Sequence, residues 1–180
     1  MLAAVSIICG KFLALNLTPF MRFSFENLPI IFAGAAFGPI GALVGAVADL
    51  VGGFIVYGGD VNPIITLGSA SIGLVSGFAW RICGRMRMPH LVRVIVTVLS
   101  AHLIGSVIIK SLALTVYLEL IGLNAVYEIP LIFVMLWRLL NYAIVGTAEG
   151  ILLYFLLKNK LILSAIGSTN RVGGKIKEKK

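Results

Sequence analysis

The sequence IGALVGAVADLVGGFIVY, residues 40–57, contains a single charged side chain, that of Asp49. A helix that crosses a membrane needs about 20 mostly apolar residues, so this stretch predicts a segment inside a lipid bilayer. The whole chain agrees, because 59% of its 180 residues are hydrophobic, only 12% are charged, and its mean hydropathy is +1.05. Soluble domains carry about 25% charged residues. The composition therefore predicts an integral membrane protein.

Turn-forming and charged residues divide the chain into six apolar segments of this kind. They cover residues 2–17, 25–37, 40–57, 63–83, 90–121 and 129–158. We therefore predict an all-α fold, an integral membrane bundle of six transmembrane helices over residues 1–160, and a basic cytoplasmic tail over residues 161–180. The first segment lacks the basic start and the cleavage site of a signal peptide, so we interpret it as a membrane helix.

Lysine and arginine residues predict how the bundle is oriented. The formal net charge is +8, but the basic residues gather at the ends of apolar segments, which favours topology signals over a nucleic-acid-binding face. The most basic regions are residues 81–93 and the chain from residue 158 onward. The positive-inside rule places both in the cytoplasm. Six spans then place both termini there, and residues 18–25, 58–62 and 122–128 outside.

Catalytic and metal-binding motifs are not found in the sequence. Cys9 and Cys83 lie in or beside apolar runs without metal-like spacing, so we interpret them as small buried hydrophobic residues. No HExxH, CxxC, P-loop or GxSxG pattern occurs. A membrane enzyme that uses Asp49, His102 and Glu149 is an alternative, but these residues lack the spacing of a nucleophile or metal constellation. We predict no catalytic residue, no metal and no cofactor.

Small residues recur at four-residue spacing on several predicted helices, which lets helix backbones approach closely. One interpretation is tight packing within the bundle, and another is an external face that docks on a second membrane protein. The first helix is the best candidate for docking, because Lys11 makes it unlike a core helix. The small residues in question are Ser6, Gly10 and Ala14 on the first helix, Gly41, Gly45 and Gly53 on the third, Ser69, Gly73 and Gly77 on the fourth, and Gly146 and Gly150 on the sixth.

Three cations lie in or near the outer half of the predicted bundle: Arg22, Lys110 and Arg138. Lys110 and Arg138 lie at similar depths, roughly 14–17 Å from the outer ends of their helices at 1.5 Å per residue. Ionisable residues inside a membrane are costly and are functional candidates by default. Asp49 could pair with Lys110 or Arg138 to hold the bundle together, and Glu149 and His102 are interpreted mainly as helix-packing residues.

A dianionic ligand would give these cations partners, since arginine binds carboxylates through two parallel hydrogen bonds. Aromatic residues close by in the sequence could stack on a flat ring system. The combination predicts a site for an anionic, aromatic small molecule. The aromatic residues are Phe20, Phe23, Phe25, Tyr57, Tyr117, Trp137 and Tyr142.

The stretch TPFMRFSFENLPIIFAGAAFGPIGALVGAVADLVGGFI, residues 18–55, resembles the first half of the S components of energy-coupling factor (ECF) vitamin transporters, particularly the folate type. The patterns F-x-R-x-x-F-x-x-L-P-I, G-x-x-F-G-P-x-G and G-A-x-A-D-L-x-G carry this resemblance. WRLLN at residues 137–141 and ILLYFLLK at 151–158 look like the last helix of that family. The resemblance spans residues 1 to about 158.

The resemblance implies a membrane subunit without ATPase activity, in the plasma membrane of a prokaryote. It would capture folate from outside and dock on a T component that carries two ATPases. Arg22 would hold a carboxylate of the glutamate tail, the phenylalanines would cover the rings, and Asp49 could accept hydrogen bonds from the pterin. The implied substrate-binding residues are Phe20, Arg22, Phe23, Phe25, Asp49, Tyr57, Lys110, Trp137, Arg138 and Asn141.

In this family, an alanine pair at four-residue spacing on the first helix contacts the T component. Here Ala4 is followed by Ile8, which departs from the pattern, while Ser6, Gly10 and Ala14 could serve instead. The predicted docking residues are therefore Ala4, Ser6, Gly10 and Ala14. Three alternatives stay open: an S component for another vitamin such as pantothenate, a non-transport membrane assembly protein, and an autonomous secondary transporter. The last is disfavoured because the two halves show no inverted repeat.

Overall fold

The structure is a computed structural model, and it describes residues 1–12, 15–18, 21–56, 63–113, 116 and 131–159. Apart from one short hairpin, the described residues form helices, and a helix occurs within each of the six predicted segments. The hairpin consists of β1 (Leu15–Thr18) and β2 (Met21–Phe23). The helices are α1 (Leu2–Phe12), α2 (Asn27–Phe37), η1 (Gly38–Ile40), α3 (Gly41–Val56), α4 (Pro63–Arg85), α5 (His90–Ala101), η2 (His102–Ile109) and α7 (Leu131–Lys158).

Among the described residues, four helical stretches are long and apolar enough to cross a membrane: Asn27–Ile55, Ile65–Arg85, His90–Ala113 and Leu131–Lys158. The predicted all-α membrane bundle is therefore confirmed at this level. The first stretch does not run straight, because a Cβ atom added at Gly41 would overlap the Cα atom of Gly34. Seven residues of straight helix would separate these positions by about 10 Å. The chain therefore reverses at Gly38, whose φ of 78° suits glycine.

The first helix is shorter than predicted. It ends at Phe12, and residues 15–18 form a strand instead of continuing the helix to residue 17. The sequence Leu15-Asn16-Leu17-Thr18 alternates apolar and polar residues, which is the period of a strand. Pro19 follows, and proline cannot continue a helix without losing a hydrogen bond. The antiparallel register pairs Leu15 with Phe23 and Asn16 with Arg22.

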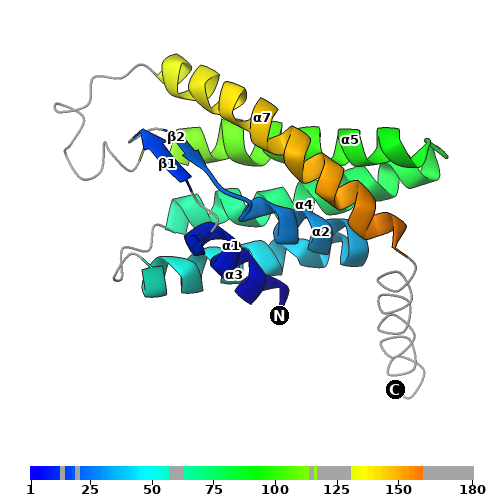
Figure 1. The fold of residues 1–180 in the computed structure, drawn as a ribbon, viewed down its shortest axis with the longest axis horizontal. Coiled ribbons are helices and arrows are strands. Elements are labelled where there is room, and N and C mark those ends of the chain that lie inside the picture. The colour runs from blue at the N-terminus through cyan, green and yellow to red at the C-terminus, as the bar shows by residue number, and fades with distance from the viewer. Residues whose placement is uncertain (13–14, 19–20, 57–62, 114–115, 117–130, 160–180) are drawn as a thin grey trace.

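The described helix and strand ends that flank the connections predicted to lie outside share one end of the bundle. The hairpin, the end of α3 and the starts of α4 and α7 lie on the left in Figure 1, whereas the turn between α4 and α5 and the end of α7 lie on the right. This arrangement agrees with the prediction that successive segments cross the membrane in alternating directions. Which end faces the cytoplasm stays a prediction. The predicted basic tail, residues 161–180, lies outside the described residues.

Small residues bring α3 and α4 together, as one of the two interpretations of their spacing predicted. A Cβ atom at Gly45 would overlap the backbone of Ser69, and one at Gly73 would overlap the carbonyl group of Gly41. Ser69 is itself buried. These stripes are therefore packing surfaces within the chain. Beside them, buried residues of α2, α5 and α7 form the apolar core, among them Ile31, Val98 and Leu153.

Replacing Gly73 with leucine is expected to destabilise the protein, because an overpacked contact forces backbone shifts that cost about 1–3 kcal/mol. Gly150→Leu is the matched control, because a Cβ atom at Gly150 meets nothing within 4 Å. Thermal melting in detergent should therefore show a lower Tm for Gly73→Leu only. Equal melting temperatures for the two variants would contradict the close α3–α4 contact.

Candidate functional site

An ion pair between Lys110 and Glu26 connects the end of η2 to the start of α2. Lys110 follows η2 directly, Glu26 precedes α2 directly, and the Lys110 Nζ atom lies 3.8 Å from the Glu26 Oε1 atom. The Lys110 side chain is buried, and its carbon chain packs over Gly68 of α4. One of the two pairings considered for Asp49, that with Lys110, is therefore not formed. Glu26 was not among the predicted site residues, so its role as partner of Lys110 was missed.

Arg138 has no acidic partner among the described residues. Its guanidinium donates a hydrogen bond of 3.3 Å to the backbone carbonyl of Ser106 in η2. A carbonyl group is neutral, so the positive charge of Arg138 is left uncompensated within the described part of the chain. Asn141 lies almost one turn further along α7 and is 5% exposed. Because residues three apart share a helix face, Arg138 and Asn141 lie on one side of α7.

The hairpin brings Arg22 close to this region. Strand β2 packs against α7, so the backbone of Arg22 lies near the helix that carries Arg138. Phe23 belongs to the same strand. The structure describes only the backbone of these two residues, and Phe20, Tyr57 and Ala14 lie outside the described residues. The prediction that Arg22, Lys110 and Arg138 line one cavity stays a prediction, and the placement of β2 agrees with it.

Two aromatic residues of the implied substrate-binding set have described side chains, and both are only partly buried. Phe25 lies two residues before α2 and is half-buried. Trp137 is half-buried on α7, and its ring stacks on that of Phe133 with centroids 6.3 Å apart and planes 7° from parallel. Both lie near the predicted outer end, and their contact with a ligand stays a prediction.

Asp49 is held by two hydroxyl groups of α4. Thr66 donates to its Oδ2 atom at 2.8 Å, and Ser69 donates to its Oδ1 atom at 3.1 Å. The carboxylate therefore links α3 to α4, and a pairing with Arg138 is not what the described residues form. A carboxylate has about four lone-pair positions, so acceptance of pterin N–H groups stays a prediction.

Thr66→Val is expected to lower the free energy of unfolding by about 1.5–3 kcal/mol, because a hydrogen bond to a charged group is lost. Thr147→Val is the control, since the Thr147 hydroxyl donates to the Ala143 carbonyl of its own helix and is exposed. Chemical unfolding in mixed micelles measures the difference. If Asp49 is structural alone, ligand affinity should stay unchanged in Thr66→Val, and a large loss of affinity would contradict a purely structural role.

A second buried pair links α7 to η2. The His102 Nε2 atom lies 2.5 Å from the Glu149 Oε2 atom, and the side chains are 5% and 0% exposed. The ring of Tyr142 stacks on His102 with centroids 4.6 Å apart. The interpretation of both residues as helix-packing groups is therefore confirmed, although the sequence did not identify them as each other's partner. Among the described residues, the Glu149 Oε1 atom has no hydrogen-bond partner.

This pair is connected to Arg138 through η2. The His102 Nδ1 atom lies 3.4 Å from the hydroxyl of Ser106, whose carbonyl accepts the hydrogen bond from Arg138. The eight residues of η2 form a π-helix, a rare conformation that often marks functional sites. Ser106 was missed by sequence reasoning, and hydropathy carries no signal for a π-helix. Glu149, His102, Ser106 and Arg138 thus form one chain of contacts between α7 and η2.

The predicted docking residues on α1 have different surroundings. Ala4 is exposed, whereas Ser6 and Gly10 are buried, and the Ser6 hydroxyl donates to the carbonyl of Glu26 at 2.5 Å. Ser6 therefore makes a contact within the chain. Val5 and Ile8 share the exposed part of α1 with Ala4. Docking on a T component stays a prediction, with Ala4 on the face that is open to a partner.

Comparison with known proteins finds similarity among solved structures. No protein-family model matches the sequence, and no curated protein is similar to it. Among solved structures, the chain is similar to FolT, from a crystal structure of FolT bound with folic acid. The TM-score is 0.65 and the sequence identity is 25%, over 86% of this chain and 87% of that chain. The resemblance to the folate-type S component is therefore confirmed at the level of the structure.

Proposed function

We propose that this chain is the folate-binding S component of an ECF-type importer. The observation that carries the proposal is the similarity to FolT, which extends over 86% of this chain. The crystal structure of FolT contains bound folic acid. An S component is a binding subunit and no enzyme, so ATP hydrolysis falls to partner ATPases. The similarity also covers 87% of the FolT chain.

The charges of the site support an anionic ligand. Folate carries two carboxylates on its glutamate tail and a flat pterin ring. Among the described residues, no acidic group compensates the Arg138 guanidinium, which shares a helix face with the buried Asn141, and Arg22 lies on the strand that packs against the same helix. Arginine binds carboxylates through two parallel hydrogen bonds. In this proposal Arg22 and Arg138 hold the glutamate tail, and Lys110 contributes charge while it is paired with Glu26.

The remaining predicted residues complete the proposed site. The aromatic residues cover the rings, Asn141 donates or accepts a hydrogen bond, and Asp49 is the least supported member because two hydroxyls already occupy it. We also propose six membrane spans with both termini in the cytoplasm of a prokaryotic cell. The capture end then faces outward, where the hairpin lies. Docking on a T component that carries two ATPases completes the proposed importer.

Reconstituted transport tests this function. Liposomes that contain this chain together with a T component and two ATPases should accumulate labelled folate when ATP is supplied. Liposomes with the chain alone should bind folate without accumulating it. Accumulation by the lone chain would contradict the S-component assignment, and so would equal uptake of pantothenate and folate by the full assembly.

A further inference from the structure

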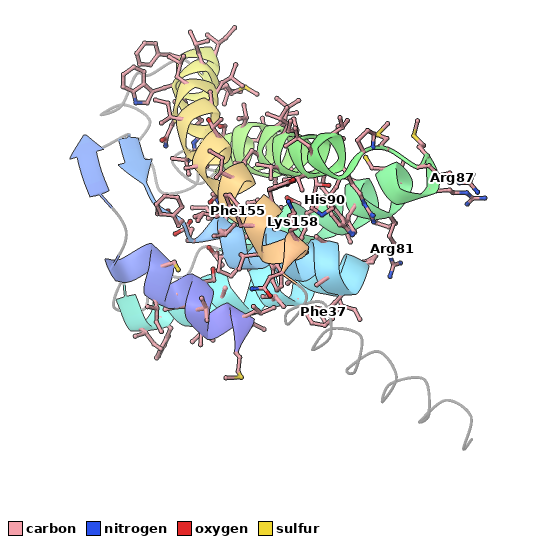
Figure 2. All side chains as sticks on the ribbon, turned by 45° about the vertical axis from the view of Figure 1, so that its right-hand side comes forward. Phe37, Arg81, Arg87, His90, Phe155 and Lys158 are labelled. Carbon is pink, nitrogen blue, oxygen red and sulfur yellow. The ribbon has the colours of Figure 1, made fainter. Side chains whose placement is uncertain are left out.

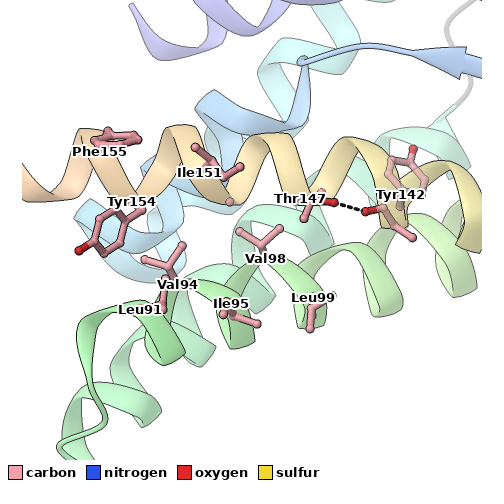
Figure 3. Close-up of a pocket in the computed structure, with 13 residues that line it drawn as sticks. Leu91, Val94, Ile95, Val98, Leu99, Tyr142, Thr147, Ile151, Tyr154 and Phe155 are labelled. Carbon is pink, nitrogen blue, oxygen red and sulfur yellow. Dashed lines mark hydrogen bonds between the residues drawn. The ribbon is translucent and has the colours of Figure 1, made fainter.

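A groove runs between α5 and α7 on the outside of the bundle, and its end at Tyr142 lies about one turn of α7 from Arg138 of the proposed folate site. Its volume is about 550 Å³. Its floor is formed by Val94, Val98 and Gly146, which are buried, and exposed side chains such as Ile95 and Ile151 form its walls. Figure 3 shows these side chains lining the space between the two helices. The groove is therefore open to the surroundings of the bundle, which in a membrane are lipid.

The lining offers water almost no hydrogen-bonding partner. Its side chains are apolar except for Tyr142, Thr147 and Tyr154. The hydroxyl of Thr147 donates to the carbonyl of Ala143, shown as a dashed line in Figure 3. A buried water needs about two to four polar partners, so this space suits a hydrocarbon chain instead.

The length of the groove matches one leaflet of a bilayer. Its lining on α7 extends from Tyr142 to Phe155, which is about 20 Å at 1.5 Å per residue. The hydrocarbon core of a bilayer is about 30 Å thick, so one leaflet measures about 15 Å. A single acyl chain could therefore lie along the groove from the middle of the membrane to the surface.

Basic side chains stand at the surface end of the groove. The ring of Tyr154 closes this end, the Lys158 Nζ atom lies 5.5 Å from its centroid, and the His90 ring packs against it edge-on at 5.2 Å. Figure 2 shows Lys158, His90 and Phe155 near one another. The acidic residues that the structure describes, Glu26, Asp49 and Glu149, all have partners elsewhere. Lys158 thus has no acidic partner within the described part of the chain.

Arg93 lies beside these groups but is already engaged. Its Nε atom donates to the carbonyl of Trp80 at 2.9 Å, and its guanidinium lies 3.7 Å from the centroid of the Trp80 ring. Its charge adds to the positive potential there, but its guanidinium is already in contact with Trp80 and is not placed to bind a ligand through two parallel hydrogen bonds. Lys158 is therefore the principal cation that a negatively charged headgroup at this end of the groove would meet, with His90 beside it.

We propose that this groove binds one acyl chain of an anionic phospholipid, whose phosphate lies at Lys158 and His90. The leaflet is the one that adjoins the turn between α4 and α5. The apolar lining favours an acyl chain, and the length of the groove matches a single leaflet. Lys158, which has no acidic partner among the described residues, favours a negatively charged headgroup. Basic sites between membrane helices on the cytoplasmic side recognise anionic headgroups in this way.

Native mass spectrometry of the purified full chain tests the proposal, with phosphatidylglycerol and phosphatidylcholine of identical acyl chains as probes. Gly150→Phe should fill the groove, because a Cβ atom at Gly150 meets open space. Ile144→Phe is its control, since Ile144 is exposed on the same helix and does not line the groove. Lys158→Gln removes the positive charge proposed to meet the lipid headgroup. Arg87→Gln removes an exposed positive charge away from the groove, as Figure 2 shows.

The wild type should retain one phosphatidylglycerol in preference to phosphatidylcholine. Gly150→Phe should lose both lipids, and Lys158→Gln should lose about fivefold in preference for phosphatidylglycerol, because one lysine contributes roughly that much near a surface. Both controls should behave as the wild type. Unchanged lipid binding in Gly150→Phe, or unchanged preference in Lys158→Gln, would overturn the proposal. Loss of T-component docking with unchanged lipid binding in Gly150→Phe would assign the groove to a partner helix instead. If Gly150→Phe fails to fold, Gly150→Leu and the Lys158→Gln result decide.

Discussion

Glu149→Ala is expected to lower the free energy of unfolding by about 3–5 kcal/mol, because it removes one partner of a buried pair and leaves His102 without its acceptor. Both side chains are almost fully buried, and the two atoms lie 2.5 Å apart. The environment of His102 cannot easily adapt, since Tyr142 stacks on one face of its ring. Chemical unfolding in mixed micelles, followed by tryptophan fluorescence, measures the change.

Two further variants show whether the pair itself is responsible. Glu149→Gln keeps a hydrogen-bond acceptor of the same size and should lose much less stability. The double variant His102→Leu with Glu149→Leu removes both polar groups, and such replacements are often neutral or stabilising. It should therefore be more stable than Glu149→Ala. A Glu149→Ala protein as stable as the wild type would show that the pair contributes nothing to the fold.

Arg138→Ala is expected to weaken folate binding by about 2–5 kcal/mol, the loss that follows removal of one partner of a buried charge pair. This corresponds to a loss of roughly 30-fold to several thousand-fold in affinity. The fold should tolerate the change, because the guanidinium makes one hydrogen bond to a neutral carbonyl group. Isothermal titration with folate measures the affinity, and thermal melting verifies that the variant is folded.

The controls for this prediction follow from chemistry and position. Arg138→Lys keeps the charge without the planar fork, so it should bind with intermediate affinity. Arg85→Ala lies in the last turn of α4, at the opposite end of the bundle, and should bind as the wild type. Pteroate lacks the glutamate tail. Its affinity should therefore differ between Arg138→Ala and the wild type much less than the affinity for folate does. Normal folate binding by Arg138→Ala would show that the binding site lies elsewhere.

Hydropathy predicted the helices well, because membrane-spanning helices must satisfy their backbone hydrogen bonds internally and therefore need long apolar runs. The bounds of α3 and α4 lie within two residues of the predicted ones. The hairpin was missed because it occupies the end of an apolar run, where composition alone cannot distinguish strand from helix. Strand β1 is only four residues long, too short for its alternation to outweigh the surrounding apolar sequence.

The candidate site was predicted in its residue types and less well in its contacts. The sequence identified Lys110, Arg138 and Asp49 as costly charges, but their partners depend on how the helices face one another. Lys110 meets Glu26, 84 positions away in the sequence, and it directly follows the π-helix η2. A one-residue change of helical register is invisible to a hydropathy pattern. The small-residue spacing, by contrast, indicated close helix packing as one of two interpretations, and α3 and α4 show it, although the spacing did not identify them as partners.

The central claim is that the chain captures folate at the end that carries Arg138. Titration of the purified protein with folate, followed by tryptophan fluorescence, tests it most directly. We expect saturable quenching at one folate per chain that is lost in Trp137→Phe and retained in Trp80→Phe, since Trp137 adjoins Arg138 while Trp80 contacts Arg93 near the opposite end of α4. Pantothenate and thiamin should cause no quenching. An absence of folate binding by the folded wild type would contradict the account.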